Sequence, residues 1–388
     1  MTIYLDHNAG APLRPEAARA ISRFAAEAEG GNPASVHRNG QRARRMLEEA
    51  RAQVAALIGA PARRIVFTSG GTESNNLAIF GAATAAPNRR KIVSSLIEHS
   101  SVMQPLAELE RRGFGVVRIA PDSEGRIDPA HAIAEINGDT ALVTLGLANS
   151  ETGTIQNFEG IAAAAMNADA LFHIDAAQAA GRVPVNVDAI GCDLMTVSAH
   201  KLGAPAGIGA LYVRDATRIM PTLLGGPHEN GLRAGTPNLL GAIAFGAAAE
   251  AAWLAMRVES ARIGALTERL HARLATEIPG LRLNGPRAAR LPNTLNLAFP
   301  GVLGESMLIA LDLEGVRVSM GSACAAGAVE PSHVLLAMGR NAAEARASLR
   351  ISLGWNTTAA EIEAAAEIIP RVWRRVAGAE PTLEAIAS

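Results

Sequence analysis

The sequence contains little lysine, little cysteine and no excess of charge of either sign. Two lysines, Lys91 and Lys201, stand against 34 arginines, and 36 basic residues nearly balance 37 acidic ones. There is no charge run typical of nucleic-acid or membrane binding. No apolar stretch looks long enough and free enough of charge to span a bilayer, and the N-terminus lacks signal-peptide features. We therefore expect no nucleic-acid partner, no membrane and a cytoplasmic location.

The scarcity of cysteine excludes a disulfide framework and a zinc site built from cysteines alone. Of the two cysteines, Cys192 precedes an apolar run, which predicts a packed, inert side chain. Cys324 lies in the small-residue stretch 321–327, which provides access and mobility. A reduced thiol in such a loop is a candidate nucleophile, although an incidental small residue in a turn would look the same.

Apolar runs alternate with helical patterns from about residue 17 to about residue 250. The expected strands are 64–68, 91–95, 115–119, 140–145, 171–175, 193–197 and 208–213, with helices such as 101–112 and 157–168 between them. This alternation predicts a mostly parallel sheet with helices on both faces, and in such folds ligands bind at the carboxyl ends of the strands.

The pattern changes after about residue 250. A long helix is expected at 242–277, followed by strands at 293–299 and 316–318 and helices at 304–314, 333–336, 342–347 and 359–375. We therefore expect an α/β fold with a large domain at 16–250. Residues 1–15 and 251–388 would form a smaller α+β domain that carries the Cys324 loop.

Lys201 follows the expected strand 193–197 and lies beside His200. Arginine can replace lysine on a surface but cannot form an imine, whereas a neutral lysine amine attacks a carbonyl. Position alone leaves a surface cation equally open.

Other polar residues follow strands in the same way, and each also has a structural interpretation. Gly71 and Thr72 open a helix after strand 64–68, where backbone amides bind anions, although Thr72 as an N-cap would look similar. Asp175 ends strand 171–175 and could pair with a protonated pyridine nitrogen or cap a helix. Ser198 and His200 could hold a phosphate.

Three further features complete the set. His99 could stack on an aromatic ring and move protons, or be an ordinary surface histidine. Arg350 lies within an apolar run and could hold a carboxylate or form an ion pair at the edge of the core. The glycine-rich stretch 225–236, with Thr236, could complete a phosphate site or simply connect elements. Pyridoxal 5'-phosphate (PLP) chemistry uses all of these groups together.

In its motifs, the chain resembles the cysteine desulfurases of the NifS/IscS type, in the class V aminotransferase group with PLP fold type I. The resemblance is carried by 4–6, 31–37, 68–76, 98–99, 151–153, 173–178, 198–201, 233–236, 304–306, 321–324 and 350–354. It implies PLP held by Lys201 as an internal aldimine, with Asp175 at the ring nitrogen, His99 stacked on the ring and Gln178 at the ring oxygen. It also implies phosphate binding by Gly71, Thr72, Ser198, His200 and the partner subunit's Thr236, and therefore a homodimer.

The same resemblance implies the substrate and the reaction. Arg350 and Asn149 would bind L-cysteine, and Cys324 would take its sulfur as a persulfide, releasing L-alanine. A sulfur-acceptor or iron–sulfur scaffold protein would follow, with Cys324 a candidate transient iron–sulfur ligand. Nitrogenase maturation, general iron–sulfur assembly and tRNA thiolation stay open as destinations.

The chain departs from the family pattern in three places, one of which is the run 227–230, where the family usually has Gly-Gln-Glu-Arg. Ser150 stands where a second asparagine usually binds the cofactor ring, and residues 6–11 lack the usual paired threonines. Two alternatives stay open: another class V PLP enzyme, such as a selenocysteine lyase or an aminotransferase, and a non-catalytic PLP-binding scaffold paralogue.

Overall fold

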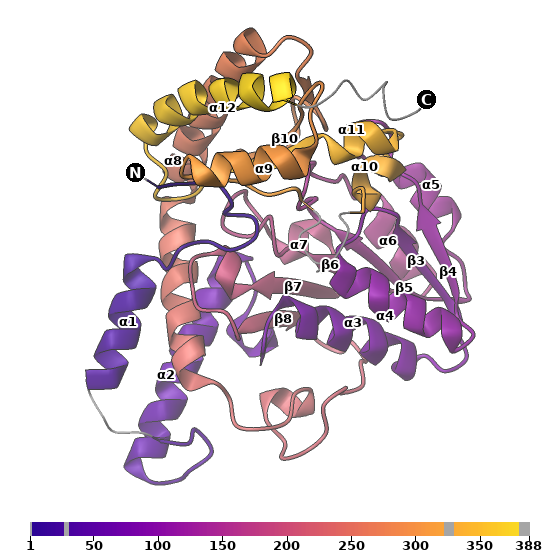
Figure 1. Ribbon diagram of the computed structural model, residues 1–388. Helices are drawn as coiled ribbons and strands as arrows, with labels where there is room; N and C mark the ends of the chain where they lie inside the picture. Colours follow the sequence, from indigo (N-terminus) through magenta and orange to yellow (C-terminus); the bar gives the residue numbers. More distant parts are fainter. Residues whose placement is uncertain (1, 27–30, 322–329, 380–388) are drawn as a thin grey trace.

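The computed structural model describes residues 2–26, 31–321 and 330–379 (Figure 1). The largest element is a seven-stranded sheet with the order β2-β8-β7-β6-β5-β3-β4. Its strands are β2 (Ile65–Thr68), β3 (Lys91–Ser95), β4 (Gly115–Ile119), β5 (Thr140–Gly146), β6 (Leu171–Asp175), β7 (Leu194–Ser198) and β8 (Gly209–Val213). Each lies within a residue or two of an expected strand.

Strand direction places the ends of most strands at one edge. The pairs β3–β4, β3–β5, β5–β6 and β6–β7 are parallel, whereas β8 is antiparallel to both of its neighbours, β2 and β7. Because β8 is antiparallel to both β2 and β7, these two strands run in the same direction. The carboxyl ends of β2, β3, β5, β6 and β7 therefore share one edge, as the expected mostly parallel sheet requires.

Helices cover both faces of this sheet. The helices of the chain are α1 (Pro15–Ala26), α2 (Arg38–Leu57), α3 (Gly71–Ala85), α4 (Ser100–Arg111), α5 (Pro129–Ala134), α6 (Ile161–Asn167), α7 (Val187–Ile190), α8 (Leu239–Glu277), α9 (Gly304–Leu313), α10 (His333–Ala337), α11 (Ala342–Arg346) and α12 (Ala359–Ala379). Short 3₁₀ turns are η1 (Ala62–Arg64), η2 (Ala199–Lys201) and η3 (Glu229–Gly231).

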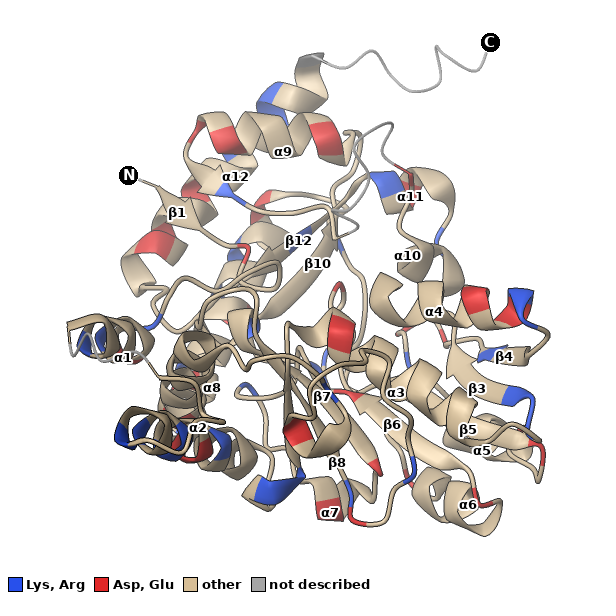
Figure 2. Ribbon diagram, turned by 90° about the horizontal axis from the view of Figure 1, so that it is seen from below, with Lys and Arg blue, Asp and Glu red and all other residues tan. Residues whose placement is uncertain are grey.

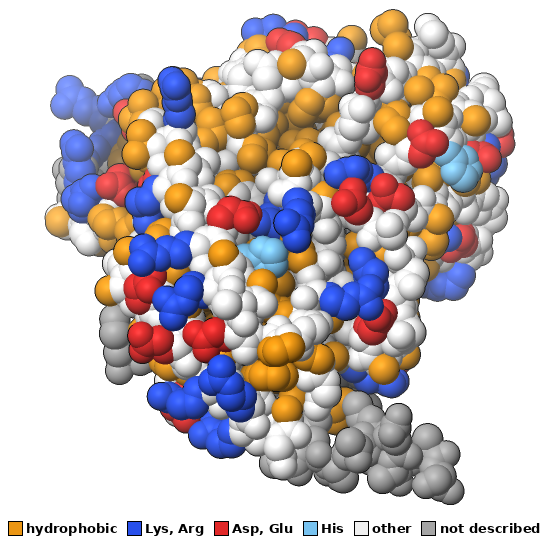
Figure 3. All heavy atoms as spheres, turned by 90° about the horizontal axis from the view of Figure 1, so that it is seen from above, with side chains coloured by type: hydrophobic (Ala, Val, Ile, Leu, Met, Phe, Trp, Pro, Cys, Tyr) orange, Lys and Arg blue, Asp and Glu red, His pale blue; other side chains and the backbone are white. Residues whose placement is uncertain are grey.

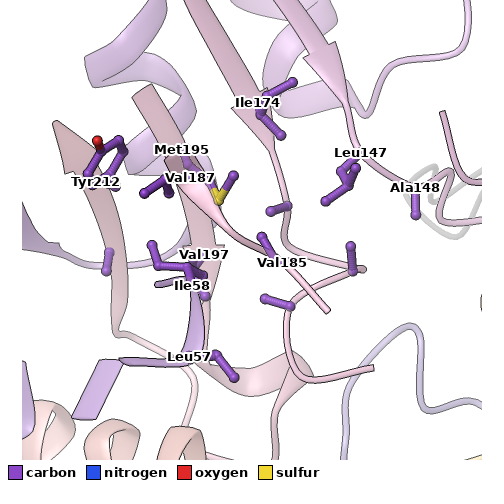
Figure 4. Packing of buried hydrophobic residues seen from close by; sticks show 14 of the residues in the cluster. Leu57, Ile58, Leu147, Ala148, Ile174, Val185, Val187, Met195, Val197 and Tyr212 are labelled. Carbon is purple, nitrogen blue, oxygen red and sulfur yellow. The ribbon is translucent and has the colours of Figure 1, made fainter. Parts of the chain in front are cut away.

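Alternate residues of each strand enter two separate cores. Leu194 and Leu211 pack with α3 and α4 on one face. Met195, Val197 and Tyr212 pack on the other face with residues of α2, α6 and α8 (Figure 4). Because both faces are covered, the strands are nearly continuous apolar runs rather than alternating ones. Such runs are easy to recognise, so the strands predicted from the sequence agree with the observed ones.

A third cluster of buried residues lies above the sheet in Figure 1. It combines β1 (Ile3–Tyr4), paired with β11 (Val316–Arg317), and the antiparallel sheet β12-β10-β9. The strands of that sheet are β9 (Arg282–Leu283), β10 (Thr294–Ala298) and β12 (Ser348–Ser352). Helices α9 and α12 and the second half of α8 cover them.

Helix α8 belongs to both parts of the molecule. Its buried residues up to Ala252 lie in the core beneath the large sheet, and those from Ile263 onward lie in the third cluster. Figure 1 shows α8 running beside α1 and α2 and on toward α12, all of which it contacts. The expected domain division at residue 250 falls inside this continuous helix.

The expectation that no segment is long and apolar enough to cross a membrane is wrong for α8. Among the described residues, this helix alone meets that criterion by length and composition. Half of its apolar window is buried inside the protein, where it packs against α2 and the sheet. These contacts are those of a core helix.

The surface carries both charge signs, as the composition indicates. In Figure 2 basic and acidic residues are interspersed on the outer helices, while the strands of the large sheet carry few of either. Figure 3, which looks down on the α9 and α12 side, shows charged and apolar side chains intermixed.

Candidate active site

A cavity of about 520 Å³ opens at the carboxyl edge of the large sheet. Its walls come from the strand ends, from the first turns of α3 and α4, and from β12 of the smaller part. Of the residues expected from the sequence, it is lined by Gly71, Thr72, His99, Asn149, Ser150, Asp175, Gln178, Ser198, His200, Lys201 and Arg350. The fold thus brings together residues separated by up to 279 positions in the sequence.

Lys201 enters the cavity from η2, just after β7. Its Nζ donates to the carbonyl oxygens of Asn8 (2.5 Å) and Ala9 (2.8 Å). Burial, together with the positive charges of Arg182 and Arg350, lowers the pKa of Lys201 from 10.5 to about 8. A sizeable fraction of this amine is therefore neutral near neutral pH, as a nucleophile requires.

Asp175 ends β6 and lines the same cavity. Its Oδ1 accepts from the backbone N–H of Ala177 (2.9 Å), and its Oδ2 accepts from Nδ2 of Asn75 (2.8 Å). The two donors hold the carboxylate at the cavity wall in one orientation. That orientation suits a partner for a cationic N–H group.

The first turn of α3 lines the cavity and suits an anion. The N-cap is Gly70, which has no side chain to satisfy the first-turn N–H groups. A Cβ on Gly209 of β8 would lie 2.6 Å from the carbonyl carbon of Gly70, so only glycine permits this approach. Ser198 Oγ lies 3.0 Å from Nδ1 of His200, and burial lowers the pKa of His200 to about 4. His200 is therefore neutral and able to donate a hydrogen bond to an anion.

Arg350 reaches the cavity from the middle of β12 and is 3% exposed. Its Nη2 lies 2.7 Å from Oδ1 of Asp6, and its Nη1 donates to the carbonyl of Ser150 (3.2 Å). Its Nε is buried and has no hydrogen-bond partner in the part of the chain that the structure describes. Arg350 thus forms an ion pair and still keeps donor capacity.

The amide side chains of Asn149 and Gln178 are largely engaged by the protein itself. Asn149 Oδ1 accepts from the backbone N–H groups of Glu151 and Thr152, and its Nδ2 donates to the carbonyl of Ile97. Gln178 Nε2 donates to the carbonyl of Asn8 (3.1 Å), and its Oε1 accepts from Arg182. Each amide keeps one N–H for a ligand.

Comparison with known proteins decides the family of this chain. A sequence model of the aminotransferase class-V family matches residues 3–365, a range that includes every residue of the cavity. The chain belongs to the aminotransferase class-V family. It is 43% identical to "Cysteine desulfurase IscS" of Dictyoglomus turgidum over 380 residues, which is 98% of this chain and 96% of that protein.

Solved structures of class-V relatives agree with this assignment. A "NifS-like protein" shares 31% identity with a TM-score of 0.90, covering 97% of this chain and 100% of the other. A structure described as "SspA in complex with cysteine" shares 32% identity with a TM-score of 0.79, covering 91% and 99%. The predicted fold class is confirmed.

The class-V family is PLP-dependent, and the cavity fits that cofactor. The uncapped turn of α3 suits a phosphate, the Lys201 amine suits an aldehyde, and Asp175 suits a pyridinium N–H. Arg350 lines the same cavity and uses one N–H of Nη1 and one of Nη2 in its bonds to Ser150 and Asp6, so its guanidinium keeps further N–H groups for a carboxylate.

Two of the expected residues do not line the cavity as described. Thr236 is exposed on the loop before α8. Cys324 lies outside the described residues, which end on one side at Gly321, a residue of the cavity wall. Cys192 is fully buried, and burial raises the pKa of its thiol to about 12, so it is inert as expected.

Glu151 contacts the chain on both sides of residues 322–329. Gly321 has φ +89°, and a Cβ there would lie 2.8 Å from Oε2 of Glu151, so both backbone and space require glycine. Ser332 Oγ donates to the same oxygen at 2.6 Å. The Glu151 carboxylate therefore lies against Gly321 and is bonded to Ser332, so one side chain contacts the described chain before and after residues 322–329.

Sequence reasoning missed several residues of the site. Asn8 and Asp6 come from the N-terminal run that departs from the family pattern, and they contact Lys201 and Arg350. Asn75 lies one turn after Thr72 on α3, so helical spacing could have placed it beside the first turn of that helix. Ser101 follows His99 by two residues and, like the other three, lines or borders the cavity.

Proposed function

We propose that this protein is a PLP-dependent cysteine desulfurase. It removes sulfur from L-cysteine, releases L-alanine and holds the sulfur as a persulfide on Cys324. The observation that carries this proposal is the meeting of Lys201, Asp175, His99 and Arg350 in one cavity. The names of the curated relatives and the cysteine complex of a solved relative support L-cysteine as the substrate.

The reaction balances without an added oxidant. The C–S bond of cysteine breaks, an S–S bond to Cys324 forms, and the substrate β-carbon gains a proton to become the methyl group of alanine. Transfer of the outer sulfur from Cys324 to an acceptor thiol leaves its oxidation level unchanged, and a thiol reductant releases it as sulfide. A thiol with this task needs a reducing compartment, so we assign the protein to the cytoplasm.

Substrate binding falls to Arg350. The N–H groups of its guanidinium that are not used by Ser150 and Asp6 offer donors to the substrate carboxylate. Asp6 neutralises part of the charge and holds the guanidinium in position. The substrate carboxylate therefore binds a guanidinium whose orientation is already fixed by Asp6.

Proton movement at the substrate falls to Lys201 and His99. Bound PLP supplies an electron sink that acidifies the substrate Cα–H bond. Lys201 Nζ, with its pKa of about 8, takes that proton, and its carbonyl partners Asn8 and Ala9 hold the resulting ammonium. His99 lines the cavity at the start of α4, where its ring can stack on the cofactor and exchange a proton.

A homodimer completes the site in this proposal. Thr236 is exposed and is not among the residues that line the cavity of its own chain, which suits a residue that reaches a partner subunit's phosphate site. The sulfur would pass from Cys324 to an acceptor protein for iron–sulfur cluster or other sulfur-cofactor assembly.

The two cysteines provide the decisive test. The PLP-loaded protein is incubated with L-cysteine and a thiol reductant, and sulfide and alanine are measured. Cys324→Ala should abolish both products while the PLP absorbance band remains, and Cys192→Ala should keep both. Formation of a keto acid without sulfide would instead indicate an aminotransferase, and PLP binding with no product of either kind would indicate a scaffold.

A further inference from the structure

Two buried polar side chains connect the carboxylate of Asp175 to the imidazole of His99. Nδ2 of Asn75, on α3, lies 2.8 Å from Oδ2 of Asp175 and 2.8 Å from Oγ of Ser101. Ser101 Oγ lies 2.8 Å from Nδ1 of His99. Asn75 is 1% exposed and Ser101 is 8% exposed, so bulk water does not compete for these bonds.

The chemistry of the groups fixes the direction of each bond. An amide nitrogen only donates, so Asn75 gives one N–H to Asp175 and the other to Ser101. Rotating the amide by half a turn would place its oxygen 2.8 Å from the Asp175 carboxylate, where two acceptors repel. Asn75 Oδ1 has no partner among the described residues, so the two N–H bonds alone hold this amide.

The Ser101 hydroxyl therefore accepts from Asn75 and gives its own proton to His99. The backbone N–H of Ser101 donates to the same ring nitrogen at 3.1 Å, so that His99 also caps α4. With two donors directed at it, Nδ1 is an acceptor and carries no proton. The proton of the neutral ring then resides on Nε2.

We propose that Asn75 and Ser101 are positioning residues that hold His99 as the Nε2–H tautomer and link its ring to the Asp175 carboxylate. This assignment rests on the proposed function, in which His99 acts at the cofactor ring. It specifies the nitrogen from which His99 acts and explains how one side chain of α3 aligns two cofactor-binding groups.

The network also opposes protonation of Nδ1, because an imidazolium would lose both of its incoming donors. The outer side of the ring is exposed to the cavity, but the surrounding protein desolvates the rest, and this lowers the pKa of His99 below its ordinary value. The other charges near the ring are Asp175, which raises this pKa, and Lys201 and His333, which lower it.

Removing the Ser101 hydroxyl tests the assignment. Ser101→Ala should raise the pKa of His99 by roughly half to one unit, the equivalent of one neutral hydrogen bond. Ser101→Thr keeps the hydroxyl and should leave this pKa unchanged. Ser100→Ala, an exposed serine in the same turn, is the matched control.

The measurement is deuterium exchange at the imidazole C2–H, followed peptide by peptide against pH in the full-length PLP-loaded protein. It reports the pKa of His99 separately from the other histidines and requires no turnover. In the active enzyme, the acid limb of kcat against pH should move by the same amount in Ser101→Ala.

An unchanged His99 pKa in Ser101→Ala would overturn the assignment. Asn75→Ala provides a second test, because Ser101 then loses the donor that directs its hydroxyl, and a smaller shift in the same direction is expected. A protein that shows both shifts but makes no alanine from cysteine would contradict the proposed function alone.

Discussion

The lowered pKa of Lys201 predicts how its amine captures PLP as pH changes. An ordinary lysine with a pKa of 10.5 is about 0.03% neutral at pH 7, whereas a pKa of about 8 leaves about 10% neutral. The structure therefore implies roughly a 300-fold larger population of nucleophile at neutral pH. The covalent capture rate should rise tenfold per pH unit below pH 8 and level off above it.

Stopped-flow absorbance after mixing the apoprotein with PLP measures this rate between pH 6 and 10. Borohydride reduction and peptide mapping then locate the adduct, which is unambiguous because Lys91 is the one other lysine. Lys91 pairs with Glu135, and Lys91→Arg should leave the profile unchanged. Lys201→Ala should abolish capture.

A variant of Arg182 tests the cause of the shift. Its guanidinium is the second contributor to the lowered pKa of Lys201, after burial. Arg182→Met removes this positive charge, so the midpoint of the profile should move toward higher pH. A capture rate that climbs without a break to pH 10 in the unaltered protein would refute the reasoning.

Two further predictions concern buried carboxylates. Glu229 forms a bidentate pair with Arg51 (2.6 and 2.9 Å) and accepts from the backbone N–H of Phe67. Glu229→Ala leaves the buried guanidinium unpaired, so it should lower the free energy of unfolding, measured by urea titration, by about 3–5 kcal/mol. A loss below about 1 kcal/mol would contradict this prediction. Burial raises the pKa of Glu98 from 4.5 to about 7 despite its bond to Ser95, so the folded state retains a proton that the unfolded chain releases. Relative to Glu98→Gln, the unaltered protein should lose about 3 kcal/mol of stability as pH rises from 4.5 through 7, and equal pH dependence of the two proteins would exclude this role.

The sequence predicted the sheet well because its strands are covered on both faces. Runs such as those around Met195 have few competing interpretations, and the glycines and polar residues that follow them mark the strand ends. The same logic placed Lys201, Asp175 and Gly71 at one edge, since parallel strands end together. These residues meet in one cavity because the order and direction of the strands place them at the same edge of the sheet.

The remaining parts of the site depend on contacts that periodicity does not encode. The two-residue strands β1 and β9 are too short to produce a pattern, yet β1 delivers Asp6 to Arg350. The carbonyls of Asn8 and Ala9 carry no side-chain signal at all. The membrane criterion failed at α8 because a helix that crosses two cores is as apolar as one that crosses a bilayer.

The continuity of α8 also limits how the protein can be divided or rearranged. The 39 residues of α8 supply buried side chains to both cores. If one core tilted relative to the other, the helix itself would have to bend. Splitting the gene near codon 250 would leave the first 12 residues of this helix in one fragment and the other 27 in the second, each with leucine and alanine side chains uncovered. Fragment-complementation designs should therefore place their breakpoints in the connections that precede Leu239 or follow Glu277, which leave the shared element whole.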